Sequence, residues 1–599
     1  MSIVQSSNRP RIVRVSSPQV DASGLVRLRL GDPLAVTVEL AGDTHERHHD
    51  DVVELWTNVD RPDAPSEYRA LAMPRVGPQR FALALPVRRV GNYRATARVR
   101  RADDLVWASE SGIADLRFRP RDPAYDALCI EEVSVAHVNW DPFAKRPGTF
   151  SDLLDDTSAY HLHQLRDRGV NAIWLMPPFP VALWPGRHAL DEAGSPYAVA
   201  DYFSIRRELL REPHALDGGI GEVRRFLDAA HGCGVRVVLD VALNHLGHEH
   251  LLRDVSLHDL DARTGLPRVT TRGVLEDVAP WMLADRHGDA RGCRQRDDKL
   301  AGGTFEWHDT AKLNHGRARA WRYAFHDVEP PRTEHLAVRA WLERVLSFWV
   351  HVGVDGFRLD HLCGLPSSML EHELNRVQAR AEQRHGRRLL LIGEDFHTHA
   401  ATLPFLDAGQ SGWFRELLAA RSASALRGIV DDPWFRDVLC VSTHDEERPV
   451  VALGDDLRAW QRLASLLLLV GGPVAFVAGD HVGERVPLPF KRWRGVPALR
   501  DPSASQRSLG DALARLGRAR HDVRALRAGQ RQWLATGTDD VLAFARRVPG
   551  DPEVAVVVAN WSNHDARDVT LDVDGHAVSL RVEPYEVLLT VRTLPSTGR

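Results

Sequence analysis

The chain has 599 residues, too many for a single hydrophobic core, so we expect several domains. Hydrophobic residues make up 44% of it and charged residues 26%, which is typical of a soluble globular protein. The net charge of −4 gives no reason to expect binding to nucleic acid or to a membrane surface.

The N-terminal part is predicted to be a β-sandwich that spans residues 1–122. Residues 1–11 are expected to be a disordered leader, and residues 1–14 lack the apolar stretch of a signal peptide. Short segments of alternating apolar and polar residues follow, separated by turn sequences, which is the pattern of a sandwich. These expected strands cover 34–40, 52–56, 81–87 and 93–99.

From residue 123 to about 529, strands and helices alternate, as in βαβ units. Strands are expected at 132–138, 172–175, 235–241, 356–360, 389–394 and 473–477. Helices are expected at 152–168, 220–233, 336–351, 366–384 and 509–526. The apolar run 463–478 is broken by Gly471, Gly472 and Pro473, so we interpret it as a buried helix before the last strand and not as a membrane span.

Two further regions differ from this alternation. Residues 246–310 are polar and loop-like, and an insertion of this length in a compact domain is usually functional. From residue 530 the pattern of antiparallel strands returns, with segments at 541–546, 554–559, 569–573 and 585–591. We therefore predict a small C-terminal β domain over 530–599.

Four segments of the central region end an apolar strand with reactive polar side chains. They are Val238-Leu-Asp240 followed by Asn244-His245, Gly356-Phe-Arg-Leu-Asp360, Leu389 to Glu394, and Cys440 to Asp445. Acids at the carboxyl ends of several parallel strands predict a (β/α)8 barrel with its catalytic groups on that face. Two carboxyl groups and a third acid are the groups needed to cleave a glycosidic bond.

In order and wording, the four segments resemble the four sequence regions of the α-amylase family, glycoside hydrolase family 13. The resemblance covers about 126–529 and, more weakly, the C-terminus. It implies a (β/α)8 TIM barrel over 123–529, with an inserted domain B at about 246–310. The N-terminal segments 11–18 and 90–94 loosely resemble the N-domain of bacterial α-1,4-glucan maltosyltransferases.

The resemblance also implies roles for the acids of the barrel. Asp360 matches the nucleophile, Glu394 the general acid/base, and Asp445 the third acid, which holds sugar hydroxyls in the transition state. Arg358 lies two residues before Asp360, so both side chains project to the same side of the strand. Its guanidinium is expected to keep the nucleophile ionised and oriented.

Other positions match residues that bind the sugar at the cleavage subsite. His245 and His444 match two histidines that donate hydrogen bonds to it, and Asp240 supports the first of the four regions. Tyr197, four residues before Asp201, matches a tyrosine that stacks on the sugar ring. The purely structural alternative stays open for Asp240 and Tyr197.

No metal or cofactor is expected, because no cysteine or histidine spacing closes a metal site. Calcium is the alternative, since Asn244 matches a calcium ligand of many family members. Five cysteines (Cys129, Cys233, Cys293, Cys363 and Cys440) are odd in number and are expected to be reduced, as in a cytosolic protein.

We predict a cytoplasmic, retaining α-glycosidase or transglycosylase that acts on α-1,4-glucans or maltooligosaccharides. One alternative is a maltosyltransferase with a phosphorylated maltose donor, although this chain has the Asn244-His245 pair that those enzymes generally lack. The other is a non-catalytic glucan-binding protein of the same fold. The run His361-Leu-Cys-Gly364 departs from the Lys-His pair of many members, so contacts on the acceptor side must differ. Hydrolysis or transfer, chain-length preference and oligomeric state are left open.

Overall fold

The structure is a computed structural model. It describes residues 11–21, 24–41, 52–101, 104–182, 193–247, 251, 253–270, 310–315, 333–394, 403–410, 414–420, 422–431, 440–496 and 501–594. The chain forms two compact units. The first runs to Asp122 and includes Pro366–Arg388 and Thr398–Asp407, and the second contains the remainder.

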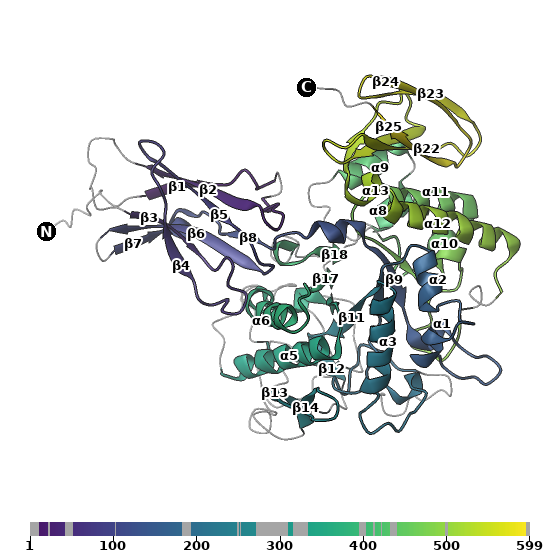
Figure 1. The fold of residues 1–599 in the computed structure, drawn as a ribbon, viewed down its shortest axis with the longest axis horizontal. Coiled ribbons are helices and arrows are strands. Elements are labelled where there is room, and N and C mark those ends of the chain that lie inside the picture. The colour runs from purple at the N-terminus through teal and green to yellow at the C-terminus, as the bar shows by residue number, and fades with distance from the viewer. Residues whose placement is uncertain are drawn as a thin grey trace. The chain divides into compact units, whose positions relative to one another are not determined.

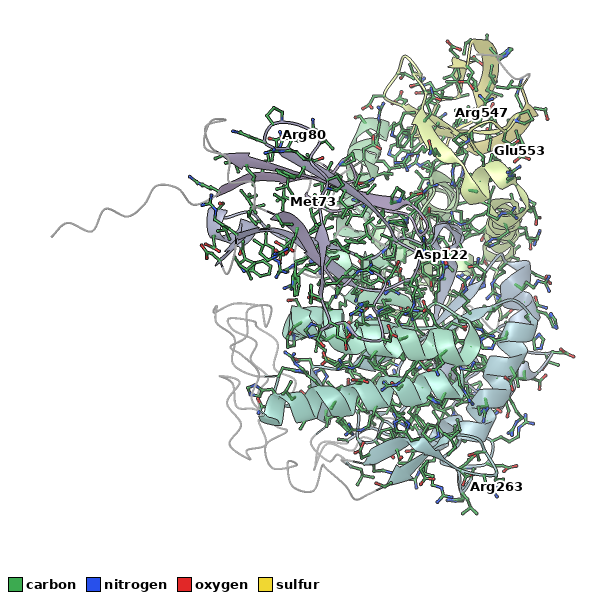
Figure 2. All side chains as sticks on the ribbon, turned by 60° about the vertical axis from the view of Figure 1, so that its left-hand side comes forward. Met73, Arg80, Asp122, Arg263, Arg547 and Glu553 are labelled. Carbon is green, nitrogen blue, oxygen red and sulfur yellow. The ribbon has the colours of Figure 1, made fainter. Side chains whose placement is uncertain are left out.

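The first unit contains a β-sandwich, as predicted. One sheet has the order β1 (Arg11–Ser16), β2 (Pro33–Ala41), β5 (Arg80–Pro86). The other sheet contains β4 (Arg69–Ala72), β3 (Val52–Thr57), β6 (Tyr93–Arg101) and β7 (Asp104–Trp107), with β8 (Leu116–Phe118) paired to β6. Alternate residues of β2 are buried, and their side chains share one core with Met73, which Figure 2 labels.

Helix α6 (Ser367–His385) belongs to this first unit. Asn375 accepts a hydrogen bond from the backbone N–H of Asn92 at 2.6 Å and donates one to its carbonyl at 2.8 Å. Arg94 forms an ion pair of 2.9 Å with the buried Glu371. The sequence predicted this helix but assigned it to the barrel alone, since polar contacts between distant segments leave no local pattern.

The second unit contains a sheet of parallel strands in the order β18 (Ala408–Gln410), β17 (Leu390–Glu394), β16 (Gly356–Asp360), β11 (Arg236–Ala242), β10 (Ala172–Leu175), β9 (Cys129–Val133), β19 (Val474–Val477). Neighbours in space are mostly neighbours in sequence, and the last strand returns to pair with the first, β9. This is the arrangement of a (β/α)8 barrel, and it confirms the predicted fold class. Helices α3 (Ile220–Gly232) and α5 (Thr333–Val352) lie outside the strands (Figure 1).

Several local predictions were wrong. The first barrel strand is Cys129–Val133, not 132–138, and α1 (Val135–Val138) follows it at once. Because the apolar run continues from the strand into this helical turn, the pattern did not mark the end of the strand. The predicted helix 152–168 is only α2 (Leu162–Asp167), preceded by the 3-10 turn Ser151–Leu154.

Residues 440–443 have no strand assignment, and 432–439 lie outside the described residues. The predicted domain B lies mostly outside them as well. Its described part is not purely loop-like, because β13 (Asp254–Leu260) and β14 (Pro267–Thr270) form an antiparallel hairpin. Strand β12 (His245–Gly247) pairs with β15 (Thr310–Lys312).

The C-terminal part of the second unit is antiparallel, as predicted (Figure 1). Strands β20 (Gln530–Trp533), β21 (Val541–Arg547), β22 (Glu553–Asn560) and β25 (Val587–Thr593) form one sheet, and β23 (Arg567–Val573) pairs with β24 (His576–Val582). Glu553, labelled in Figure 2, accepts a hydrogen bond of 2.7 Å from the backbone N–H of Ala525. This hydrogen bond connects the sheet to α13 (Arg524–Ala528) of the barrel.

The remaining helices of the second unit are α8 (Phe414–Ala419), α9 (Ala423–Val430), α10 (Pro449–Ala452), α11 (Leu457–Val470) and α12 (Ala504–Asp522). The predicted helix 509–526 is thus two helices, α12 and α13. Within the described part of the chain, no helix is long and apolar enough to cross a membrane.

Candidate active site

Arg358 is the centre of the predicted site. It lies on β16, and its guanidinium is almost fully buried. Nη1 lies 2.7 Å from Oδ1 of Asp360, and Nη2 lies 3.1 Å from Oε1 of Glu394. Parallel pairing of β16 with β17 brings these two carboxylates together, since each ends its own strand. One guanidinium therefore holds both predicted catalytic carboxylates on adjacent nitrogens.

Asp240 is the third carboxylate on this guanidinium. It lies on β11, opposite Arg358 in the strand register, and is 3.2 Å from Nη1. Its other oxygen accepts hydrogen bonds of 2.9 Å from the indole of Trp174 and the hydroxyl of Tyr197. With no exposed surface and every oxygen bound, Asp240 is placed to orient Arg358 rather than to touch a sugar.

A strained backbone turn orients Glu394. His361, directly after Asp360, has φ 48°, which a residue with a side chain seldom adopts. Its backbone N–H donates a 2.8 Å hydrogen bond to Oε2 of Glu394. Three residues later, a Cβ on Gly364 would come within 2.4 Å of Oδ1 of Asn244, so only glycine fits there. The run that departs from the family pattern is therefore tightly packed beneath the site.

His444 connects the remaining predicted residues. Its ring stacks on that of Tyr197, with centroids 5.2 Å apart and an angle of 21°. Nε2 lies 3.2 Å from Oδ2 of Asp445, and Nδ1 lies 2.6 Å from Oε1 of Glu132. Tyr197 is only 9% exposed, so His444 covers one face of the ring that was predicted to stack on a sugar.

The charges of the cluster influence one another. Burial and the Glu394 carboxylate raise the pKa of Asp360 well above its usual range, and the opposing effect of Arg358 is smaller. Burial likewise raises the pKa of Asp240 against the effect of Arg358. Burial alone would raise the pKa of Asp445, but the hydrogen bond and the charge of His444, together with the charges of Arg358 and Lys491, outweigh burial and lower that pKa. Asp360 and Asp240 should therefore stay protonated to a higher pH than an isolated carboxyl group would.

His245 is buried and begins β12, three residues after β11 ends. Its Nδ1 lies 3.4 Å from the amide nitrogen of Asn244. His245 thus follows the strand of Asp240 closely in the chain, while the other seven predicted residues are joined in one network around Arg358 by the contacts given above.

Sequence reasoning missed four residues that contact this network. Gln410, at the end of β18, accepts hydrogen bonds of 3.2 and 3.1 Å from Nε and Nη2 of Arg358. Trp174 binds Asp240, Glu132 contacts His444, and the ring of Phe490 meets the His444 ring edge-on at 4.9 Å. For Glu132 a signal was present, because two adjacent acids interrupt the apolar strand Cys129–Val133.

No group of three histidine, cysteine or acidic residues among those described is arranged to hold a metal ion. No disulfide joins the described cysteines Cys129, Cys233 and Cys440. Asn244, the predicted alternative calcium ligand, already packs with its Oδ1 against Gly364.

We predict that activity survives removal of metal ions, because proton transfer from a carboxyl group to the leaving oxygen needs no metal. The measurement is prolonged dialysis against EDTA, followed by assay with and without added calcium. Complete loss of activity that calcium alone restores would show that a calcium site, with Asn244 as the candidate ligand, maintains the enzyme.

The chain is similar to several known proteins. A family model, "Alpha amylase, catalytic domain", matches residues 158–384, a range that contains Asp240 and Asp360 but ends before Glu394. Alpha-amylase MalA of Haloarcula japonica is 24% identical over 428 residues, which are 68% of this chain and 52% of that protein. Neopullulanase 2 of Thermoactinomyces vulgaris is 24% identical over 494 residues, 76% of this chain and 70% of that protein.

The crystal structure of a maltogenic α-amylase, AmyB, from Thermotoga neapolitana is similar in fold. Its TM-score is 0.56 at 18% sequence identity, and the match covers 79% of this chain and all of that one. The chain spans about half the length of MalA, so the comparisons do not extend to that whole protein. The parallel barrel, the order of the four motifs and the matched catalytic-domain model make this chain similar to the α-amylase family of glycoside hydrolases, family 13.

Proposed function

We propose that the chain is a retaining α-glycoside hydrolase or transglycosylase that acts on α-1,4-linked glucans or maltooligosaccharides. The observation that carries the proposal is the binding of Asp360 and Glu394 to adjacent nitrogens of Arg358. Retaining enzymes hold their two carboxyl groups about 5–5.5 Å apart, too close for a water molecule between nucleophile and sugar, and the binding of both carboxylates to one guanidinium supports a separation of this kind. The relatives named α-amylase and neopullulanase support a glucan as the substrate class.

Asp360 is proposed as the nucleophile. Arg358 holds Oδ1, which leaves the second oxygen of the carboxylate to attack the anomeric carbon. A carbon–oxygen bond to Asp360 forms as the glycosidic bond breaks, and the leaving oxygen takes a proton from Glu394. Water or a sugar hydroxyl then attacks the same carbon, returns a proton to Glu394 and releases Asp360. Hydrolysis and transfer share this covalent intermediate.

Glu394 can act as the acid only after it gives up one of its two N–H partners. Its oxygens accept from the backbone of His361 and from Arg358. Arg358 also binds Asp240, Asp360 and Gln410, so it has other acceptors when Glu394 turns toward a leaving oxygen.

His245, His444, Tyr197 and Asp445 are proposed to bind the sugar at the cleavage subsite, with Asp445 tightening its hold in the transition state. Asp445 is the exposed member of this set, with 56% of its side chain accessible. A cytoplasmic location and activity without a cofactor stay predictions.

The test is proton NMR of the first sugar released from maltoheptaose. We expect the α-anomer to appear first, with the β-anomer growing only as mutarotation proceeds. First appearance of the β-anomer would disprove double displacement at Asp360 and Glu394.

The same assay separates the alternatives. No cleavage of maltoheptaose, with consumption of maltose 1-phosphate in its place, would show a phosphate-dependent maltosyltransferase. Binding of the glucan without turnover of either substrate would show a non-catalytic glucan-binding protein.

A further inference from the structure

Glu132 is a buried carboxylate at the end of β9 that the proposed mechanism does not use. It is 1% exposed, and its Oε1 lies 2.6 Å from Nδ1 of His444. The opposite ring nitrogen of His444 lies 3.2 Å from Oδ2 of Asp445. Glu132, His444 and Asp445 therefore form a line from the interior of the barrel to an exposed carboxylate.

We infer that Glu132 is a positioning residue of the active site, which acts on Asp445 through His444. The inference rests on the proposed function, because Asp445 is assigned there to the sugar. Glu132 itself touches neither the sugar nor the reacting atoms. Glu132 determines which ring nitrogen of His444 faces Asp445, and it keeps both ring nitrogens protonated.

The geometry requires this second effect. A neutral imidazole has one N–H, so it can donate to only one of two carboxylates. Both nitrogens of His444 face carboxylate oxygens, so only the imidazolium donates to both. Burial alone would lower the pKa of His444, but Glu132 and Asp445 outweigh burial and raise that pKa well above its usual range.

Other groups around His444 do not replace Glu132. Asp240 is near enough for the two charges to interact, but its oxygens are bound by Arg358, Trp174 and Tyr197. The hydroxyl of Tyr197 donates its hydrogen bond to Asp240. Lys491, over the ring of Phe490, adds positive charge and acts on Asp445.

The ring is also held in place. Tyr197 stacks on it, and Phe490 and Trp174 meet it edge-on, at 85° and 81°. These three aromatic rings hold the His444 ring in one plane, and the hydrogen bond to Glu132 fixes the orientation of the ring within that plane.

Glu132→Gln tests the inference, because the amide keeps the shape and an acceptor oxygen but loses the charge. Histidine labelled with ¹⁵N would follow the titration of His444, assigned with a His444→Gln variant. In the wild type the imidazolium should persist through neutral pH and be lost only as pH rises through the raised pKa. In Glu132→Gln that loss should move to lower pH.

The kinetics should change in the same direction. At neutral pH, kcat/KM of Glu132→Gln on maltoheptaose should fall about 10- to 100-fold, the size expected for loss of one charge-assisted hydrogen bond. The alkaline limb of its pH profile should begin at lower pH. Because Asp445 is assigned to the transition state, the fall should lie more in kcat than in KM.

Glu131→Gln is the matched control. Glu131 is the preceding residue of the same strand and is equally buried, but it binds the hydroxyl of Tyr160 at 2.9 Å. This variant should leave the titration of His444 and the pH profile unchanged. Glu132→Asp keeps the charge on a shorter side chain. If the glutamine variant fails to fold, the aspartate variant should still retain part of the wild-type activity.

An unchanged His444 titration in folded Glu132→Gln would overturn the inference. So would an equal shift in Glu131→Gln. If the wild type cleaves no glucan, the proposed function fails, while the NMR titration still decides whether Glu132 controls His444.

Discussion

Asp360→Asn is expected to lower turnover of maltoheptaose by about 10⁴-fold or more, the loss seen when one member of a concerted catalytic group is removed. An amide cannot form the covalent bond to the anomeric carbon that the proposed mechanism requires. The substitution is nearly isosteric, and the amide oxygen can still accept the hydrogen bond that Arg358 donates to Oδ1. Steady-state kinetics on the pure, folded variant measure this, and retention of a tenth of wild-type activity would remove Asp360 from the mechanism.

The same variant should not be less stable at neutral pH. Because the folded-state pKa of Asp360 is raised, ionisation of this carboxyl costs the fold stability as pH rises above the ordinary pKa of aspartate. Asparagine removes that cost. We therefore expect a Tm equal to or above that of the wild type at pH 7, with the difference disappearing in acid. Thermal unfolding followed by circular dichroism at several pH values checks the sign.

Asp480→Asn provides a control with the opposite pattern. Asp480 is buried and binds Arg448 at 2.9 Å, while its other oxygen accepts from Ser442 and from the backbone of Val477. An amide there must point its NH2 at a donor, so Tm should fall while kcat of the folded protein stays near that of the wild type. Loss of activity in both variants would mean that the lower activity results from partial unfolding and not from loss of a catalytic group.

The predictions were most accurate for strands in which a short apolar run has a clear end. Strands β10 and β16 lie where they were predicted, because Met176-Pro177 follows the first and the charged Arg358 and Asp360 mark the second. The residues around Arg358 were predicted from the motifs at the strand ends. Parallel pairing places the ends of these strands side by side, so the residues around Arg358 could be grouped without knowledge of their individual contacts.

What the sequence could not show depends on contacts between distant residues. Glu132 and His444 are 312 residues apart, and nothing in either segment specifies which carboxylate meets which ring nitrogen. Gln410 ends a strand of only three residues, too short for a periodic pattern. The positive φ of His361 turns one amide toward Glu394, and a backbone angle of this kind leaves no signature in a residue with a side chain.

Glu394→Gln is expected to separate the two half-reactions. Glutamine cannot give a proton to the leaving oxygen, so cleavage of maltodextrins should fall by about 10²- to 10⁴-fold. α-Glucosyl fluoride needs far less acid assistance, so it should still form the covalent intermediate on Asp360. Deglycosylation should then be slow, because residue 394 is also the base for the incoming water. Mass spectrometry of the intact protein should detect the accumulated glucosyl-enzyme.

Azide decides whether residue 394 has both roles. It attacks the intermediate without needing a base, so it should restore turnover of the fluoride by Glu394→Gln and yield an α-glucosyl azide. Glu446→Gln is the matched control, since Glu446 follows Asp445 directly but forms its ion pair with Arg415, at 3.3 Å. It should cleave both substrates at near wild-type rates and show no response to azide. An equal loss on maltodextrin and fluoride in Glu394→Gln, without azide rescue, would mean that Glu394 is not the acid/base, because loss of the acid alone should spare formation of the intermediate from the fluoride.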